Sequence, residues 1–193
     1  MIKEKFFPTI IYAKDINLNT THLSQIIFDL SKKDKGVKKT NVNGWHSTPD
    51  MQTKQEYQEL CKELYDMQVD IYKEEFLDRK PVLGNMWANI NPPGAYNKLH
   101  CHPNSLFSGV YYLKSEPNSG RLKIHEPRPG KQLNIPSLQK EKLPQDLWDS
   151  VYLEPIVGRV VMFPSWLWHE VEPNESNDLR ISISFNFIQH GFQ

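Results

Sequence analysis

Hydrophobic positions in the first part of the chain recur at helical spacing. Leu23, Ile26, Ile27 and Leu30 fall on one face of a helix that follows polar capping residues and ends at a charged run. A second and longer periodic segment covers residues 50–77, where Lys and Glu separate the apolar positions. Such a helix has one apolar face, so we expect it to pack on the outside of a sheet.

From Val82 onward the pattern changes to short apolar runs that are broken by Gly, Pro and Asn. Runs of this kind predict strands, and one earlier strand is expected at Pro8–Ala13. The later strands are expected at Asn85–Asn91, Ser108–Lys114, Arg121–His125, Val151–Ile156, Arg159–Phe163 and Leu179–Ile188. Several short strands separated by turn residues favour a sandwich or jelly roll, so the expected fold is mainly β with flanking helices.

The chain contains no internal repeat and no low-complexity linker that would mark a domain boundary. Its 193 residues suit one domain with a well-filled core, whereas two small domains would each be hard to stabilise. We therefore expect a single domain over residues 1–193, with helical support at about residues 15–80 and a strand-rich core at about residues 82–190.

Composition narrows the classes of partner and the compartment. Lys and Arg together number 23, as do Asp and Glu, so the net charge indicates neither a nucleic-acid nor a membrane partner. Cys61 and Cys101 have no paired spacing, which is typical of a reducing, cytoplasmic compartment. No apolar stretch has the length of a signal peptide or a bilayer span.

One long irregular insertion, Pro127–Asp149, interrupts the strand-rich part of the chain. Excursions of this length within a domain are often lids or binding loops. The sequence does not distinguish a lid from a variable surface loop.

Two histidines one residue apart form the strongest candidate for metal chemistry. His100 and His102 enter a strand-like run, where side chains two residues apart point to the same face. His169, which follows the strand-like run Arg159–Phe163, offers a third imidazole. Imidazole is a good ligand for iron, copper, nickel and zinc, so these three residues form a candidate metal site. The remaining histidines stand alone and are interpreted as surface or hydrogen-bonding residues: His22, His46, His125 and His190.

A strand with one polar face follows His169. In Leu179–Phe185, alternation places Arg180, Ser182 and Ser184 on one side of the strand and apolar residues on the other. The planar guanidinium of Arg180, supported by the Ser182 hydroxyl, suits a carboxylate that is bound through both oxygens. A solvated face, on which Arg180 pairs with Asp178 or a glutamate, is the alternative.

Together these segments resemble the core of the 2-oxoglutarate and Fe(II)-dependent oxygenases, over about residues 82–188. The segments that carry the resemblance, in chain order, are His100-x-His102, Ser108–Leu113, Gly120–Leu122, Gly158–Ser165, His169 and Arg180-x-Ser182. The His-x-His-Pro and Phe-Pro-Ser-Trp-x-x-His sequences are similar to those of a group of oxygenases from marine bacteria and their phages. This likeness implies a bacterial or phage-infected cell as the source.

The resemblance implies a double-stranded β-helix, a cupin-like jelly roll whose open end holds the metal. By position, His100 would be the first metal ligand and His169 the distal ligand. His102 would occupy the place where the wider superfamily has Asp or Glu. Because the usual triad contains one carboxylate, a carboxylate from Glu126 or Glu170 is an alternative third ligand, in which case His102 would have a hydrogen-bonding role.

The same resemblance implies a binding site for the cosubstrate. Arg180 would bind the far carboxylate of 2-oxoglutarate, assisted by Ser182 and the phenol of Tyr112. Asn89 and Asn97 are expected to line the same pocket.

The implied activity is that of a dioxygenase that uses Fe(II), 2-oxoglutarate and O2. It would hydroxylate a C–H bond of a peptide, amino acid or small metabolite and release succinate and CO2. A likeness to prolyl hydroxylases at Tyr111-Tyr112-Leu113 allows a peptidyl proline as substrate, and a homodimer is left open. Two alternatives remain: a cupin-like enzyme with three histidines that does not use 2-oxoglutarate, and a metal-binding module without turnover.

Overall fold

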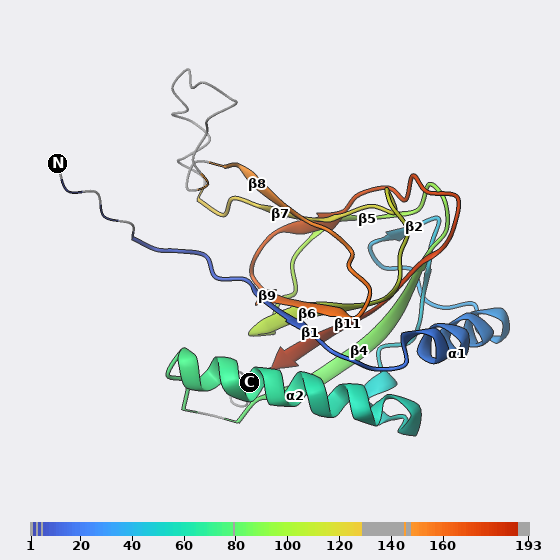
Figure 1. The fold of residues 1–193 in the computed structure, drawn as a ribbon, viewed down its shortest axis with the longest axis horizontal. Helices are drawn as coiled ribbons and strands as arrows, with labels where there is room; N and C mark the ends of the chain where they lie inside the picture. Colours follow the sequence, from blue (N-terminus) through green and yellow to red (C-terminus); the bar gives the residue numbers. More distant parts are fainter. Residues whose placement is uncertain are drawn as a thin grey trace, which may run out of the picture.

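Two antiparallel sheets face each other in the computed structural model, which describes residues 2, 4, 6–78, 80–128, 145 and 148–188 (Figure 1). The six-stranded sheet has the order β1 (Tyr12–Asp15), β9 (Arg159–Pro164), β6 (Phe107–Lys114), β11 (Arg180–Ile188), β4 (Val82–Asn91) and β3 (Trp45–His46). The five-stranded sheet has the order β2 (Asn41–Val42), β5 (Tyr96–His100), β10 (His169–Val171), β7 (Leu122–His125) and β8 (Ser150–Leu153). The expected jelly roll, a mainly β fold with flanking helices, is confirmed.

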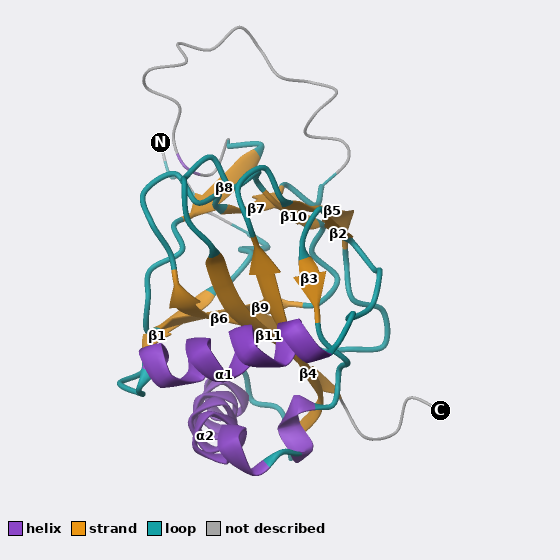
Figure 2. Cartoon of the chain, turned by 90° about the vertical axis from the view of Figure 1, so that its right-hand side faces the viewer, coloured by secondary structure: helices purple, strands orange, loops and turns teal. Residues whose placement is uncertain are grey.

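Two helices cover the outer face of the six-stranded sheet: α1 (Thr20–Lys33) and α2 (Gln58–Glu74) (Figure 2). The Asn19 side chain caps α1 by accepting a hydrogen bond of 3.0 Å from the backbone N–H of His22. Ile27 of α1 and Leu64 of α2 are completely buried in the cluster that fills the space between the helices and the sheet. The predicted packing of the second helix outside a sheet is confirmed.

Strand β11 lies between β4 and β6 and carries two different faces. Ile181, Ile183, Phe185 and Phe187 belong to the buried cluster under the helices. A smaller apolar cluster lies on the opposite side and joins the two sheets; its buried members are Tyr112, Leu122, Ile124, Val161, Phe163 and Leu167.

The predicted strands after residue 82 occur within a few residues of their expected bounds, but several others differ. The first strand is displaced to Tyr12–Asp15, where its partner is β9. Residues 50–57 form two 3₁₀ turns, Met51–Thr53 and Gln55–Tyr57, before α2 begins. Strands β2, β3, β5 and β10 were not predicted, and β2 and β3 show that the helical part also contributes to both sheets.

None of the helices in the described ranges combines the length and the apolar character needed to cross a membrane. Most of the insertion Pro127–Asp149, including residues 129–144, lies outside the described residues, so its role as a lid stays a prediction.

Candidate metal and cosubstrate site

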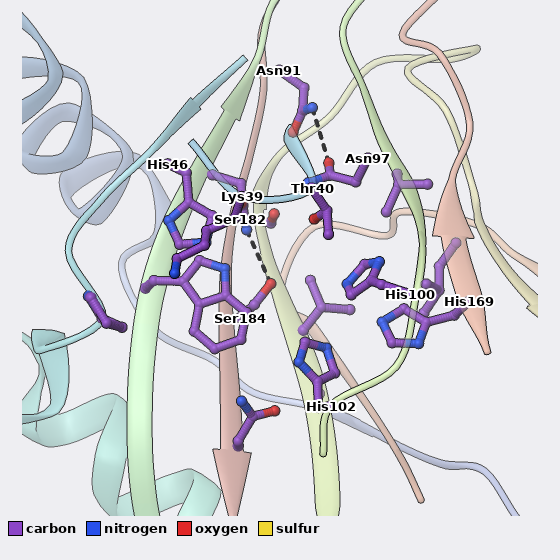
Figure 3. A pocket seen from close by; sticks show the side chains of 18 of the residues that line it. Lys39, Thr40, His46, Asn91, Asn97, His100, His102, His169, Ser182 and Ser184 are labelled. Atoms are coloured by element: carbon purple, nitrogen blue, oxygen red, sulfur yellow. Dashed lines mark hydrogen bonds between the residues drawn. The ribbon is translucent and has the colours of Figure 1, made fainter. Parts of the chain in front are cut away.

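The imidazoles of His100, His102 and His169 face one another between the two sheets (Figure 3). One ring nitrogen of each residue lies within 4.8 Å of those of the other two. The ring centroids are 5.0 Å apart for His100 and His102, 4.2 Å for His100 and His169, and 5.0 Å for His102 and His169. The structure therefore brings together the three histidines that the sequence predicts.

Strand pairing explains how residues so distant in the chain meet. His100 ends β5 and His169 begins β10, and the two are direct partners across the antiparallel pair. The backbone N–H of His102 donates to the carbonyl of Ser165 over 3.0 Å, which fixes the third residue against the loop after β9.

Hydrogen bonds orient two of these rings. Nδ1 of His100 lies 2.6 Å from the carbonyl oxygen of Lys98, and Nδ1 of His169 lies 2.9 Å from that of Leu167. Because a carbonyl oxygen only accepts, each Nδ1 carries the proton and each Nε2 keeps a free lone pair. Backbone contacts of this kind fix the tautomer of metal-binding histidines.

Burial keeps the three imidazoles neutral. Desolvation lowers the pKa of His169 to about 3 and that of His102 to about 4, and it also lowers the pKa of His100. Neutral nitrogen donors fit iron and other first-row metals, so the donor set fits the metal that the resemblance implies.

Arg180 is a buried cation, and none of the described residues provides it with an acidic partner. The residue is 2% exposed, and Nη1 donates to the carbonyls of Ser119 and Gly120, both over 2.8 Å. No carboxylate of the described residues forms an ion pair with its guanidinium. Asp178, the nearest acidic residue in the sequence, pairs with Lys114 instead. The alternative of an Arg180–Asp178 pair is therefore wrong. Burial lowers the pKa of Arg180 to about 10, so the side chain remains charged at neutral pH.

The carbonyls that hold Arg180 lie in a turn that requires glycine. Gly120 has φ +90°, and a Cβ added there would lie 2.8 Å from Nη1 of Arg180 and 2.3 Å from the carbonyl oxygen of Glu172. A buried guanidinium held only by neutral carbonyls retains an unbalanced charge. This unbalanced positive charge favours an anion in the adjacent cavity.

The other predicted cosubstrate residues line the same cavity as the histidines and Arg180: Asn89, Asn97, Tyr112 and Ser182. Ser182 is opposite Tyr112 on β6 and Asn89 on β4. Burial raises the pKa of Tyr112 to about 12, so its phenol remains protonated and can donate. The Oδ1 atoms of Asn89 and Asn91 are buried without a hydrogen-bond partner, which leaves acceptors available to a bound molecule.

The two carboxylates considered as alternative third ligands are engaged elsewhere. Glu126 accepts from Nε and Nη2 of Arg128 over 2.7 and 2.8 Å. Glu170 pairs with Lys123 at 3.0 Å and lies 3.2 Å from His125. Among the described residues the histidine cluster includes neither of them, and its third member is His102.

The sequence did not indicate several residues that line this cavity of about 370 Å³. His46 is one of them; its hydrogen-bonding role is observed, because Nδ1 donates to the carbonyl of Ser47 over 2.7 Å. Lys39 and Thr40 also line it, from the segment before β2. A lone histidine and an ordinary lysine carry no sequence signal, and only strand pairing brings them here. His190 lies outside the described residues.

Comparison of the sequence with family models identifies one family. The model described as "Putative 2OG-Fe(II) oxygenase" matches residues 85–186, more than half of the 193-residue chain. No curated protein matches the chain in sequence.

Solved structures share the fold across almost the whole chain. A prolyl-4-hydroxylase from Pseudomonas putida is 17% identical with a TM-score of 0.65, and the match covers 95% of this chain and 94% of that one. A Trichoplax adhaerens prolyl hydroxylase, solved with a hypoxia inducible factor peptide fragment, is 15% identical with a TM-score of 0.63, covering 92% and 83%. HygX from Streptomyces hygroscopicus, solved with nickel and 2-oxoglutarate bound, is 12% identical with a TM-score of 0.63, covering 96% and 85%.

At these identities the likeness establishes the fold, a double-stranded β-helix. The region matched by the family model contains the histidine cluster and Arg180. The chain therefore belongs to the 2OG-Fe(II) oxygenase family, an oxidoreductase family.

Proposed function

We propose that His100, His102 and His169 bind Fe(II), and that Arg180 binds the far carboxylate of 2-oxoglutarate. The three imidazoles face one another, and Arg180 lines the same cavity. Ser182 and Tyr112 assist Arg180, while Asn89 and Asn97 line the cosubstrate pocket. The enzyme then hydroxylates a C–H bond of a peptide, amino acid or small metabolite.

The observation that carries this proposal is the unpaired charge of Arg180. A buried cation without a counter-ion destabilises the protein unless an anion fills the site, and a guanidinium binds a carboxylate through two parallel hydrogen bonds. A cupin-like enzyme that does not use 2-oxoglutarate has no general need for such a residue, so Arg180 favours the oxygenase over the cupin-like alternative.

Bound Fe(II) supplies the activation of O2 that couples decarboxylation of 2-oxoglutarate, to succinate and CO2, to oxidation of the substrate. The residues of the chain orient the reactants around it. Arg180 fixes one end of the cosubstrate, and the Tyr112 phenol donates a hydrogen bond beside it. Phe163, whose ring lies 4.8 Å from that of His169, excludes water from one side of the metal site.

The neutral donor set affects how binding of the metal and binding of 2-oxoglutarate depend on each other. Without a carboxylate ligand, the metal retains its full double charge until the cosubstrate arrives. We therefore expect strong coupling, in which 2-oxoglutarate increases the affinity for the metal and the metal increases the affinity for 2-oxoglutarate by the same factor.

The experiment measures Fe(II) and 2-oxoglutarate binding by anaerobic equilibrium dialysis, and succinate release in air with ascorbate. We expect the wild-type protein to bind both and to release succinate slowly without substrate. Measured without 2-oxoglutarate, the Arg180→Gln variant should bind the metal as the wild type does. Its 2-oxoglutarate affinity should fall about 100-fold, because a charge-assisted contact is removed from a buried site.

Arg159→Gln is the matched control, since Arg159 pairs with Asp15 on the surface at 2.6 Å and lies away from the cavity. It should behave as the wild type. Metal binding by the wild type without any 2-oxoglutarate binding would contradict the proposal. It would favour the cupin-like enzyme that does not use 2-oxoglutarate. If Arg180→Gln lost metal affinity, measured without 2-oxoglutarate, as strongly as it lost 2-oxoglutarate affinity, the arginine would be structural.

A further inference from the structure

Residues 37–49 form a wall of the cavity that lies outside the part matched by the family model. Lys39, Thr40, His46 and Pro49 contribute to it, whereas the family match begins at residue 85. Figure 3 shows Lys39 and His46 on the side of the cavity away from the three histidines.

Backbone hydrogen bonds hold this wall in place. The N–H of Val37 donates to the carbonyl of His46 over 2.8 Å, and the N–H of Lys98 on β5 donates to that of Thr40 over 3.0 Å. The Asn41 side chain accepts from the N–H of Lys39 over 2.8 Å. The wall is therefore attached to both sheets, as expected of a surface that positions a ligand.

The wall is continuous with the metal site through stacked rings. The ring of His46 is nearly parallel to the indole of Trp87, at 8° and 5.5 Å, and the indole lies 5.7 Å from the ring of His102. A molecule bound against His46 and Trp87 is thus next to the predicted metal ligands.

The charges that line the cavity have one sign. Arg180 and Lys39 are the cations among its described lining residues, and none of those residues is Asp or Glu. Lys39 is exposed at the cavity wall and has no ion pair among the described residues, whereas Lys32 and Lys54, which do not line the cavity, each have an acidic partner. The local potential is positive and favours an anion.

A charge count leaves room for that anion after the cosubstrate has bound. Fe(II) and Arg180 together carry three positive charges, of which the 2-oxoglutarate dianion neutralises two. In the usual triad the carboxylate ligand neutralises the third. Here three neutral imidazoles leave it uncompensated, and Lys39 adds another across the cavity.

We infer that the substrate of this site bears a carboxylate, which Lys39 binds from the wall opposite the three histidines. The inference rests on the proposed function and deepens it by naming the substrate class. A phosphate group is less suited, because phosphate sites usually use a helix N-terminus or a glycine-rich loop, and neither α1 nor α2 begins at a cavity residue.

The test uses small carboxylates and their uncharged primary amides as matched probes, for example valerate with valeramide and N-acetylproline with N-acetylprolinamide. Binding is measured by ligand-observed NMR on the protein loaded with Zn(II) and 2-oxoglutarate. We expect the carboxylate of at least one pair to bind about tenfold more tightly than its amide, as one charge-assisted contact would give.

Lys39→Gln should abolish this preference. Lys38→Gln is its control, because Lys38 is exposed as Lys39 is but does not line the cavity. Equal binding of carboxylates and amides by the wild type would overturn the inference. So would equal effects of the two lysine variants, tighter binding of methyl phosphate than of any carboxylate, or displacement of the carboxylate by chloride at equal concentration.

Measurement of 2-oxoglutarate affinity in the same samples separates the two proposals. If 2-oxoglutarate binds and Arg180→Gln weakens it, the proposed function stands whatever the probes do. If 2-oxoglutarate fails to bind, the proposed function fails first, and the charge count behind the substrate class fails with it.

Discussion

The two faces of β11 bury residues of opposite character, which alternate along the strand. On the helix side, Ile183 and Phe185 are completely buried among apolar neighbours. On the cavity side, Arg180 is just as inaccessible but has only neutral carbonyl partners, and Ser182 is buried beside it.

The contrast separates stability from function at the level of single residues. Burial of apolar side chains provides the free energy of folding. Burial of an unpaired guanidinium opposes folding, so the cavity face is maintained at the expense of stability. Substitutions on the two faces should therefore differ in sign as well as in size.

The largest effect is expected on the helix side. Phe185→Ala should lower the free energy of unfolding by about 3–5 kcal/mol, because it leaves a cavity under the helices. Urea denaturation measures this change. Ser184→Ala, on the opposite face of the strand, should cost less than about 1 kcal/mol, since it removes a single contact with Asn89. Similar losses of unfolding free energy in the two variants would show that the two faces of β11 do not differ in their contribution to stability.

The metal site should be the next most sensitive region. His169→Gln is expected to weaken binding of Fe(II), or of Zn(II) as a substitute, by about 100-fold or more. With metal at 100 times its dissociation constant, wild-type stability should rise by about 2.7 kcal/mol, and the variant should lose most of this gain. Thermal unfolding with and without a chelator measures it. His125→Gln should respond to metal as the wild type does, because His125 lies outside the cluster.

Arg180→Leu should change the stability in the opposite direction to Phe185→Ala. Without metal or 2-oxoglutarate, we expect this variant to be as stable as the wild type or more stable by about 1 kcal/mol, because a desolvated charge is removed. Chemical denaturation of the metal-free proteins checks this. A loss of more than 2 kcal/mol would mean that the hydrogen bonds to Ser119 and Gly120 stabilise the fold more than the buried charge opposes it.

The smallest effect is expected at Ser182. Its hydroxyl would contribute one hydrogen bond to the cosubstrate, so Ser182→Ala should reduce 2-oxoglutarate affinity by about five- to tenfold and leave stability almost unchanged. Isothermal titration calorimetry distinguishes this from the much larger effect of Arg180→Gln. An unchanged affinity would remove Ser182 from the cosubstrate site.

The sequence predicts those structural features whose pattern lies within a single helix or strand. The alternation in β11 predicts both of its faces, and the apolar repeat in α1 predicts its buried residues, because these patterns lie within one element. Strand β10 has only three residues and no apolar run, and it is ordered because β5 and β7 pair with it on both sides. A single-sequence pattern cannot contain that information.

The site shows the same limit. The His-x-His spacing brings two imidazoles together within a few residues. The place of His169 after a strand-like run makes it a candidate for the third, and the resemblance adds its role as distal ligand. His46 joins the cavity only because β3 pairs with β4 and places it opposite Asn89. Likewise, nothing in the sequence indicates that the carboxylate of Glu126 is directed toward Arg128.

The turn at Gly120 links the two sheets through a side chain rather than through strand hydrogen bonds. Arg180 starts β11 of the six-stranded sheet, while Ser119 and Gly120 lie just before β7 of the five-stranded sheet, separated from it by Arg121. An anion bound to the guanidinium would therefore also act on this connection, so cosubstrate binding should stabilise the contact between the two sheets at this turn. Even an alanine at position 120 would disturb the guanidinium and its anchor together.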